Sequence, residues 1–408
     1  MGVVANVILV SESAVLGQVS GIRLASPYWS DTGELRQTLV DRCGCQFDVL
    51  RMYSNTGYDN GLRMNGTITY VAQAYGEPNS NWGLEPFAGE LPNDPLRARY
   101  AAVNGPAAEV AWARARLNDE VISVEQTRTW NLSAVWRLGT VQGDVWLKSV
   151  PDFFGHEGQM IDMLAALDPS AVPCLIAHEP GRTLMRAMPG VEQYEAPVDV
   201  LQRVINRLVP LQDVMAARVE DVLAAGAPDW REGPLTTAIA DVFERHAHEL
   251  APADMACVAQ LISELPQRFA EVRASGVPDT LVHGDCHPGN VRIDVESGAL
   301  VIFDWGDSGV GCPLLDYPAL ASQSGADAVP IVQRMLCTAW RVAVPGCDPE
   351  RALRAIEPIA ALRQATIYRK FLDNIERAEY IYHADDPRIW LTRAARLIGS
   401  GTTSARVT

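Results

Sequence analysis

Long apolar runs are missing from this sequence. A membrane-spanning helix needs roughly 18 consecutive apolar residues, and no stretch of the chain reaches that length. The residues Met1–Val10 are apolar but lack a basic segment in front of them, so Asn6–Val10 is expected to form a strand and not part of a signal peptide. We therefore expect a cytoplasmic protein that has no membrane partner.

Positive charge is also scarce. The chain has 34 Lys and Arg against 50 Asp and Glu, which gives a formal net charge of −16. Such a surface repels nucleic acid and attracts cationic small molecules. The eight cysteines include no Cys-x-x-Cys pair and no Cys/His array. The sequence therefore predicts no nucleic-acid partner, no zinc site and no disulfide framework.

What is present favours two or three domains, because 408 residues exceed one ordinary core. The first 98 residues read as a small α/β unit. Its expected strands and helix follow the alternation of apolar residues, and Gly44 supplies a helix stop. The expected elements are strands at 6–10, 15–19, 47–53 and 66–74 and a helix at 34–43.

This order of elements is similar to the Nudix fold. A Nudix enzyme carries a run of Mg²⁺-binding glutamates on its helix, whereas the segment Gln37–Cys45 has the single carboxylate Asp41. The pattern therefore predicts a structural or regulatory accessory domain without pyrophosphatase activity.

The stretch 281–305 has the most specific motif. His283-Gly284-Asp285 is followed by Asn290, which is the H-x-D-x-x-x-x-N spacing of a kinase catalytic loop. In such a loop the Asp takes the proton of the acceptor hydroxyl and the Asn binds a metal ion. An apolar run, 300–303, then ends at Asp304. The intervening residues alternate and contain a turn, so the stretch predicts loop, strand, turn and strand, with both ends facing one nucleotide.

These residues resemble the aminoglycoside phosphotransferase family, whose fold and phosphate chemistry are related to those of protein kinases. The family has H-G-D, an Asn five residues after the Asp, and an I-D-W-like segment, here Phe303-Asp304-Trp305. The resemblance implies that Asp285 orients or deprotonates the acceptor hydroxyl. It also implies that Asn290 and Asp304 bind Mg²⁺, which bridges the phosphates of ATP.

A phosphate-binding lysine is implied as well. Residues 121–128, 134–138 and 145–150 read as consecutive strands, and Lys148 follows the apolar part of the third. In kinase-like folds this strand presents a Lys to the α- and β-phosphates, and a Glu on the next helix, here Glu157, pairs with it. A lysine that reaches water and a solvated Glu explain the same pattern.

No G-x-G-x-x-G loop lies between the first two of these strands. The phosphate cover is instead expected at Trp130–Ser133, where Asn131 or Ser133 would donate a hydrogen bond to a phosphate oxygen. In the resembling fold the backbone of the connection between lobes binds the adenine edge, which points by position to Arg186 and Met188. A plain hairpin explains those two residues equally.

From Val198 onward the apolar residues recur at helical spacing and predict a mainly α lobe. On a helix expected over Ala352–Tyr382, acidic residues recur every three positions, and the resembling enzymes line their acceptor site with acidic residues of C-terminal helices. A solvated helix face explains the pattern equally. The candidates for binding a cationic acceptor are Asp307, Asp373, Glu376 and Glu379. Asp316 is expected to cap the helix that begins near it.

The sequence thus predicts an α+β protein with a bilobal, protein-kinase-like fold. The expected parts are an accessory α/β domain at 1–98, a β-rich lobe at 106–190 and a helical lobe at 191–408. The expected activity is transfer of the γ-phosphate of ATP to a hydroxyl of a small molecule, preferably an amino sugar or aminoglycoside.

Two alternatives stay open at this point. One is another small-molecule kinase of the same fold, acting on choline, homoserine, a thioribose or glucosamine. The other is a non-catalytic, nucleotide-binding regulatory protein. The sequence also leaves open the choice between ATP and GTP, the phosphorylated position and the oligomeric state.

Overall fold

The chain is built as two units, each assembled from separate stretches. The first contains Met1–Gly155, Leu175–Ala187 and Phe371–Ala384, and the second contains His156–Cys174, Met188–Lys370 and Asp385–Thr408. The computed structural model describes residues 3–26, 28–58, 64–79, 83–194, 196–322 and 327–403. One of the points where the chain crosses between the units lies at Ala187 and Met188, within the predicted connection between lobes. The division into three domains stays a prediction.

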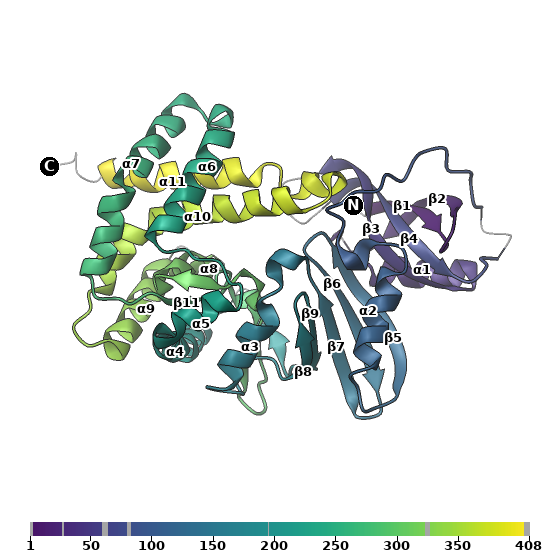
Figure 1. The fold of residues 1–408 in the computed structure, drawn as a ribbon, viewed down its shortest axis with the longest axis horizontal. Helices are drawn as coiled ribbons and strands as arrows, with labels where there is room; N and C mark the ends of the chain where they lie inside the picture. The colour runs from purple at the N-terminus through teal and green to yellow at the C-terminus, as the bar shows by residue number, and fades with distance from the viewer. Residues whose placement is uncertain are drawn as a thin grey trace. The chain divides into compact units, whose positions relative to one another are not determined.

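A four-stranded sheet with one helix forms the N-terminal part of the first unit (Figure 1). The strands lie in the order β2-β1-β4-β3; β1 and β4 are parallel, and the other pairs are antiparallel. The predicted strands and helix are confirmed. Their bounds are β1 Val3–Val10, β2 Val15–Leu24, α1 Gly33–Cys43, β3 Gln46–Tyr58 and β4 Met64–Tyr75.

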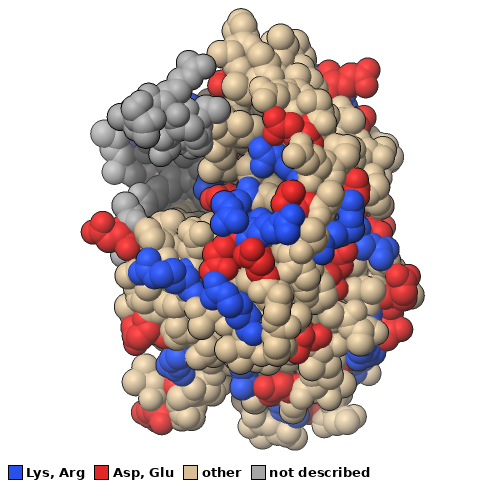
Figure 2. Space-filling view, turned by 90° about the vertical axis from the view of Figure 1, so that its left-hand side faces the viewer, with Lys and Arg blue, Asp and Glu red and all other residues tan. Residues whose placement is uncertain are grey.

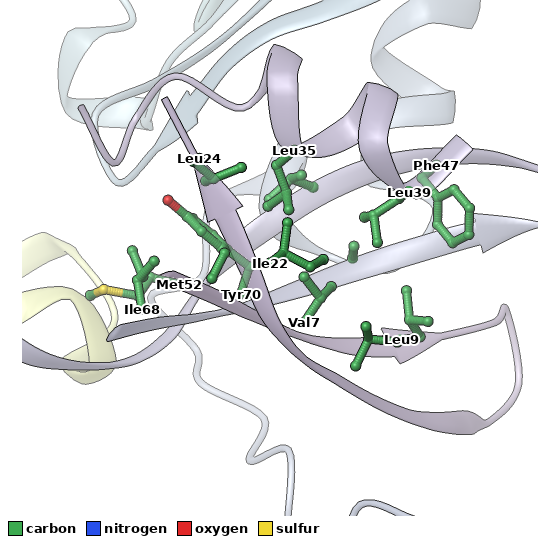
Figure 3. Packing of buried hydrophobic residues seen from close by; sticks show 14 of the residues in the cluster. Val7, Leu9, Ile22, Leu24, Leu35, Leu39, Phe47, Met52, Ile68 and Tyr70 are labelled. Carbon is green, nitrogen blue, oxygen red and sulfur yellow. The ribbon is translucent and has the colours of Figure 1, made fainter. Parts of the chain in front are cut away.

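Helix α1 covers one face of this sheet. Its residues Leu35 and Leu39 are buried and point toward apolar side chains of the strands, among them Val7 and Ile22 (Figure 3). The helix ends where the sequence predicts, because Gly44 adopts a left-handed conformation with φ 71° that favours glycine, and its N–H bonds to the carbonyl of Val40 at 2.9 Å.

The second sheet of the first unit has five strands in the order β5-β6-β7-β9-β8, with antiparallel neighbours. Trp112 of the helix α2 packs with Trp136, Leu138 and Leu147 of this sheet in one core. The expected run of strands is confirmed. The bounds are η1 Arg99–Ala101, α2 Gly105–Arg114, β5 Val121–Trp130, β6 Ser133–Thr140, β7 Gly143–Ser149, η2 Asp152–Phe154, β8 Leu175–Glu179 and β9 Arg182–Arg186.

A C-terminal segment completes the first unit. The helix predicted over Ala352–Tyr382 is wrong at its end, because α10 spans Pro349–Asn374 and a 3₁₀ helix, η8, spans Arg377–Tyr382. Glu376 between them has extended backbone, with φ −66° and ψ 146°. Tyr382 is buried in the core of the N-terminal sheet, where its ring stacks on Trp29 at 3.4 Å between centroids.

The second unit is mainly helical, as predicted. Helices α6 and α7 lie side by side, and α11 packs against both (Figure 1). The helices are α3 Glu157–Ala165, α4 Val198–Met215, α5 Val219–Ala224, α6 Glu232–His246, α7 Pro252–Ala274, α8 Tyr317–Ala321, α9 Val329–Ala343 and α11 Asp386–Thr403, with α10 contributing up to Lys370. Short 3₁₀ helices are η3 Ala216–Arg218, η4 Ala247–Glu249, η5 Pro288–Asn290, η6 Trp305–Asp307 and η7 Pro313–Asp316.

Two small sheets hold the motif stretch of the second unit. Strands β12 (Val291–Ile293) and β13 (Leu300–Ile302) form an antiparallel hairpin, and β10 (Val191–Glu192) extends it beside β12. Strand β11 (Thr280–Val282) pairs with β14 (Gly309–Gly311). The predicted order of loop, strand, turn and strand is therefore confirmed.

The surface carries charges of both signs. On the face shown in Figure 2, acidic and basic side chains lie close together, and ion pairs of the second unit include Arg351 with Glu271 at 2.6 Å and Arg268 with Glu264 at 3.0 Å. In the described part of the chain, no helix combines the length and apolar character needed to cross a membrane.

Candidate active site

The loop after β11 places the motif residues. Strand β11 is buried and leads into His283, and Asn290 ends the 3₁₀ turn η5 before β12 begins. The side-chain Nδ2 of Asn290 donates to the carbonyl oxygen of Asp285 at 2.9 Å and to the carboxylate Oδ2 of Asp285 at 3.3 Å. Because the amide donor faces Asp285, the Oδ1 of Asn290 remains the atom able to bind a cation.

Asp304 is delivered by β13. The main chain joins it to the loop, because the N–H of Phe303 donates to the carbonyl of Asn290 at 3.0 Å. Asp304 itself has a left-handed backbone, with φ 64° and ψ 60°. Strained conformations of non-glycine residues persist mainly where the surrounding structure enforces them, often at functional sites. The structure thus brings Asp285, Asn290 and Asp304 together as predicted.

The electrostatics agree with this grouping. Burial raises the pKa of Asp285 well above its usual range, and the negative charge of Asp304 raises it further. Arg363 and the hydrogen bond from Asn290 act in the opposite direction. Two partly buried carboxylates whose charges repel each other form an arrangement that a cation stabilises.

His283 supports the loop and is not a free base. Its Nε2 donates to the carbonyl of Phe303 at 3.0 Å, and its Nδ1 accepts the N–H of Asp285 at 3.3 Å. Burial lowers the pKa of His283 to about 4, so the imidazole is neutral at physiological pH. Through these two hydrogen bonds the neutral imidazole connects Phe303, the residue before Asp304, with the backbone of Asp285.

Asp316 has a different role from the helix cap that the sequence predicts. Its side chain makes no capping bond to α8. Instead Oδ2 accepts the N–H of His283 at 3.0 Å and Oδ1 accepts that of Gly284 at 2.7 Å. Gln212 of α4 also donates to Oδ2 at 2.8 Å. The buried carboxylate therefore fixes the backbone immediately before Asp285, because its oxygens accept these N–H groups and none from the first turn of α8.

Sequence reasoning missed His287 and Arg363. The Nε2 of His287 lies 3.6 Å from Oδ2 of Asp285, while its Nδ1 accepts the N–H of Gly289 at 3.0 Å. Arg363 on α10 donates from Nη2 to the carbonyl of Gly284 at 2.6 Å. The available signal for Arg363 was a charge directly after the apolar helical run Ile359–Leu362.

Sequence comparison identifies the family. A model of the phosphotransferase enzyme family matches residues 128–354, which is over half of the 408 residues. The chain belongs to this family. The match contains the whole motif stretch and Lys148, so the predicted family and the expectation of an enzyme are confirmed. No curated protein is similar enough in sequence to count as a match.

Solved structures of phosphotransferases share the fold. The GDP and kanamycin complex of APH(2")-IIIa is 16% identical, with a TM-score of 0.50, 74% of this chain covered and 99% of that chain. A proposed aminoglycoside phosphotransferase of Ralstonia eutropha is 17% identical, with a TM-score of 0.50, 72% of this chain covered and 98% of that chain. Both confirm the predicted α+β, kinase-like fold.

Lys148, the candidate for binding the α- and β-phosphates, lies on β7. Val145 and Leu147 of this strand are buried in the core beside α2, and the alternation of a strand turns the half-buried Lys148 to the opposite face of the sheet. Glu157 is the first residue of α3 and is buried. Lys148 belongs to the first unit and Glu157 to the second, so their pairing stays a prediction.

The β5–β6 turn contains the predicted phosphate cover. Asn131 is buried, and neither atom of its side-chain amide has a hydrogen-bond partner among the described residues. Ser133 accepts the indole N–H of Trp130 at 2.9 Å. At the other end of the sheet, the N–H of Ala187, between Arg186 and Met188, donates to the carbonyl of Asp144 at 3.1 Å.

The acceptor candidates do not share one helix face. Asp373 lies on α10, whereas Glu376 and Glu379 lie beyond its end and are buried in the first unit. Arg97 donates to Glu376 at 3.1 Å. Burial raises the pKa of Glu379, and the charge of Glu376 raises it further. The grouping along one helix is therefore wrong, because the helix ends at Asn374.

Asp307 lies in η6, three residues after Asp304, and is half-buried in the second unit. Burial lowers the pKa of Lys370, and the negative charge of Asp307 opposes that shift. A cationic side chain of the protein is therefore within electrostatic reach of this carboxylate.

Magnesium fits the residues present. Mg²⁺ is commonly held by one or two carboxylates and by substrate phosphates, so a full protein cage is not needed. Asp304 and the Oδ1 of Asn290 offer two oxygen ligands beside the partly buried carboxylate of Asp285. Within the described residues no cluster of three or more His, Cys, Asp or Glu side chains has the geometry of a metal site.

Proposed function

We propose that this phosphotransferase moves the γ-phosphate of ATP to a hydroxyl group of a small molecule, with Asp285 as the residue that orients and deprotonates the hydroxyl. The supporting observation is the Asp285 carboxylate, fixed by Asn290 and placed under the negative charge of Asp304. A carboxylate with a raised pKa is a better proton acceptor. Phosphoryl transfer depends mainly on positioning and charge neutralisation, which such a loop provides.

Nucleotide binding would draw on several residues. Bound Mg²⁺ supplies charge neutralisation at the phosphates, and Asn290 and Asp304 would hold it. Lys148 would contact the α- and β-phosphates, with Glu157 as its partner, and the backbone from Arg186 to Met188 would face adenine. The buried amide of Asn131, which has no partner in the described part of the chain, supports a hydrogen bond to a phosphate oxygen. The hydroxyl of Ser133 would donate another.

The preferred acceptor is an amino sugar or aminoglycoside. This preference depends on Asp307, because the carboxylate of Glu376 is already engaged by Arg97. An acceptor ammonium at Asp307 would compete with the charge of Lys370. A screen of ATP consumption over aminoglycosides, amino sugars, amino alcohols and neutral sugars tests the preference. Turnover with neutral sugars alone would rule it out.

Substitution of Asp285 tests the mechanism. Asp285→Ala and Asp285→Asn should lower kcat by about 10²–10⁴ and leave ATP affinity nearly unchanged, because the carboxylate acts on the acceptor. Steady-state kinetics and calorimetry measure the two quantities. Asp294→Ala is the matched control, since Asp294 lies in the β12–β13 turn and bonds only within it in the described structure. Unchanged kcat in both Asp285 variants would refute the mechanism.

A further inference from the structure

Arg363 is a buried charge beneath the loop that contains Asp285. Its side chain is only 2% exposed, and it lies on α10 among buried apolar residues that include Ile359 and Leu362. Burying a guanidinium is costly unless it is paired and hydrogen-bonded. A charge kept at this position therefore requires compensation from its surroundings.

The compensation comes from the loop before Asp285 and from Trp230. Nη2 of Arg363 donates to the carbonyl of Gly284 at 2.6 Å. The guanidinium also lies over the ring of Trp230, with Cζ 4.1 Å from the ring centroid, a favourable cation–π geometry. The backbone of Trp230 is itself fixed, because its main-chain N–H donates to the carbonyl of Val310 in β14 at 2.7 Å.

The residue before Asp285 is thus held from two sides. Arg363 binds the carbonyl of Gly284, while Asp316 accepts its N–H at 2.7 Å. Gly284 has φ 88°, which favours glycine, and a Cβ at this position would collide with the carbonyl of Asp307. A larger residue at position 284 would therefore force the loop away from η6, and the contacts of Arg363 and Asp316 fix the backbone that leads into Asp285.

Arg363 also compensates the acidic residues around it. Burial lowers the pKa of Arg363, and the negative charges of Asp316, Asp307 and Asp285 all oppose that shift. These carboxylates belong to η7, to η6 and to the catalytic loop, so one cation on α10 interacts with three separate segments.

We infer that Arg363 is a positioning residue for phosphoryl transfer, which holds the Gly284 carbonyl and keeps the Asp285 carboxylate aligned with the acceptor hydroxyl. The inference rests on the proposed role of Asp285. Arg363 binds neither nucleotide nor acceptor in this role. Its removal therefore affects the transfer step and spares nucleotide binding.

Two substitutions test this role. Arg363→Met keeps the length of the side chain without its donors, and it should lower kcat by about 10²-fold, the effect expected for a misplacement near 1 Å, with KM for ATP within about twofold. Arg363→Lys keeps the charge and a hydrogen-bond donor on a somewhat shorter side chain, and it should restore at least about tenfold of the lost kcat. Should the Met variant fail to fold, the Lys and Gln variants give the same comparison.

Two controls separate positioning from loss of stability. Leu261→Ala creates a cavity in α7, where Leu261 is fully buried, and it should lower Tm without lowering kcat. Arg203→Met removes a similar bond, from Nη2 to the carbonyl of Gly298 at 2.8 Å, and should keep full activity. A kcat of Arg363→Met within about threefold of wild type would overturn the inference. The inference would also fail if Leu261→Ala, at the same Tm as Arg363→Met, showed the same fall in kcat.

The proposed function is judged separately. If Asp285→Ala keeps full turnover, the role of Asp285 fails, whatever Arg363 variants do. If Asp285→Ala is inactive while Arg363→Met is fully active, the inference about Arg363 alone fails.

Discussion

Asp304 combines an unusual backbone with a predicted metal-binding side chain. Its left-handed φ of 64° is shared, among non-glycine residues in the described part of the chain, with Asn104 alone. Aspartate tolerates this conformation better than most residues, though at some cost. An aspartate at this position adds backbone strain that a glycine would avoid, which points to a use for its carboxylate.

Two substitutions of Asp304 distinguish the effect of its carboxylate from the effect of its backbone strain. Asp304→Gly keeps the left-handed backbone without strain and removes the carboxylate, whereas Asp304→Ala removes the carboxylate and adds strain. Both should weaken Mg²⁺-dependent ATP binding by at least about tenfold, or 1.4 kcal/mol. Calorimetry with and without Mg²⁺ measures this difference. Wild-type Mg²⁺ dependence in Asp304→Gly would show that Asp304 is no metal ligand.

Asp48 makes stability depend on pH. Burial raises the pKa of Asp48 on β3 to about 6, and Arg36 partly opposes the shift. The folded state therefore binds the proton of the Asp48 carboxyl group more tightly than the unfolded state does. The stability gained from this proton is fully present below the pKa of the unfolded state, and it is lost as the pH rises through about 6. The loss is at most about 3 kcal/mol.

Asp48→Asn should remove this part of the pH dependence. Urea unfolding at pH 4, 5, 6 and 7 should show a flatter decline of the free energy of unfolding than in wild type. Asp41→Asn is the control, because Asp41 is an exposed carboxylate on α1. Parallel curves for wild type and Asp48→Asn would contradict the prediction.

At the scale of elements, η8 behaves as part of the N-terminal sheet. Tyr382 stacks on Trp29 at an interplanar angle of 8°, and its hydroxyl lies 2.8 Å from the sulfur of Met52. Arg51 of β3 approaches Glu376 at 3.7 Å. The segment after α10 therefore fills a place in a core whose other residues come from the first 75 positions.

Tyr382→Ala should destabilise the first unit strongly. Removing a buried aromatic ring leaves a cavity and costs about 3–5 kcal/mol. Tyr380→Ala is the control, because Tyr380 is only half-buried on the same 3₁₀ helix, and it should cost less than about 1.5 kcal/mol. Near-ultraviolet circular dichroism and thermal unfolding report the loss of the Trp29 stack. Equal effects of the two variants would disprove the importance of this stack.

At the scale of the whole molecule, local patterns predicted most elements, because alternation and helical spacing act over a few neighbours. The strands around Lys148 and the hairpin between Asn290 and Asp304 follow directly from such patterns. The end of α10 did not, since neither Gly nor Pro lies between Phe371 and Tyr382. Contacts with Trp29 and Met52, more than 300 positions away, outweigh helix propensity there.

In the candidate site too, local spacing could be predicted from the sequence and long-range contacts could not. The motif spacing predicted the grouping of Asp285, Asn290 and Asp304, because loop and hairpin are contiguous in the chain. The anchoring by Asp316 and Arg363 depends on distant packing, across 32 residues from Gly284 to Asp316 and 79 from Gly284 to Arg363. The acidic pattern at Asp373, Glu376 and Glu379 misled because it assumed one unbroken helix.

The place of Tyr382 in the N-terminal core also affects biosynthesis. Tyr382 and Met52 are 330 positions apart, and ribosomes add about 5–20 residues per second. The N-terminal sheet therefore waits roughly 15–70 s for its last core side chain. During that interval we expect a nascent chain to expose the face of Trp29 that Tyr382 covers in the folded protein, which would make the N-terminal region a target for chaperones until translation is nearly finished.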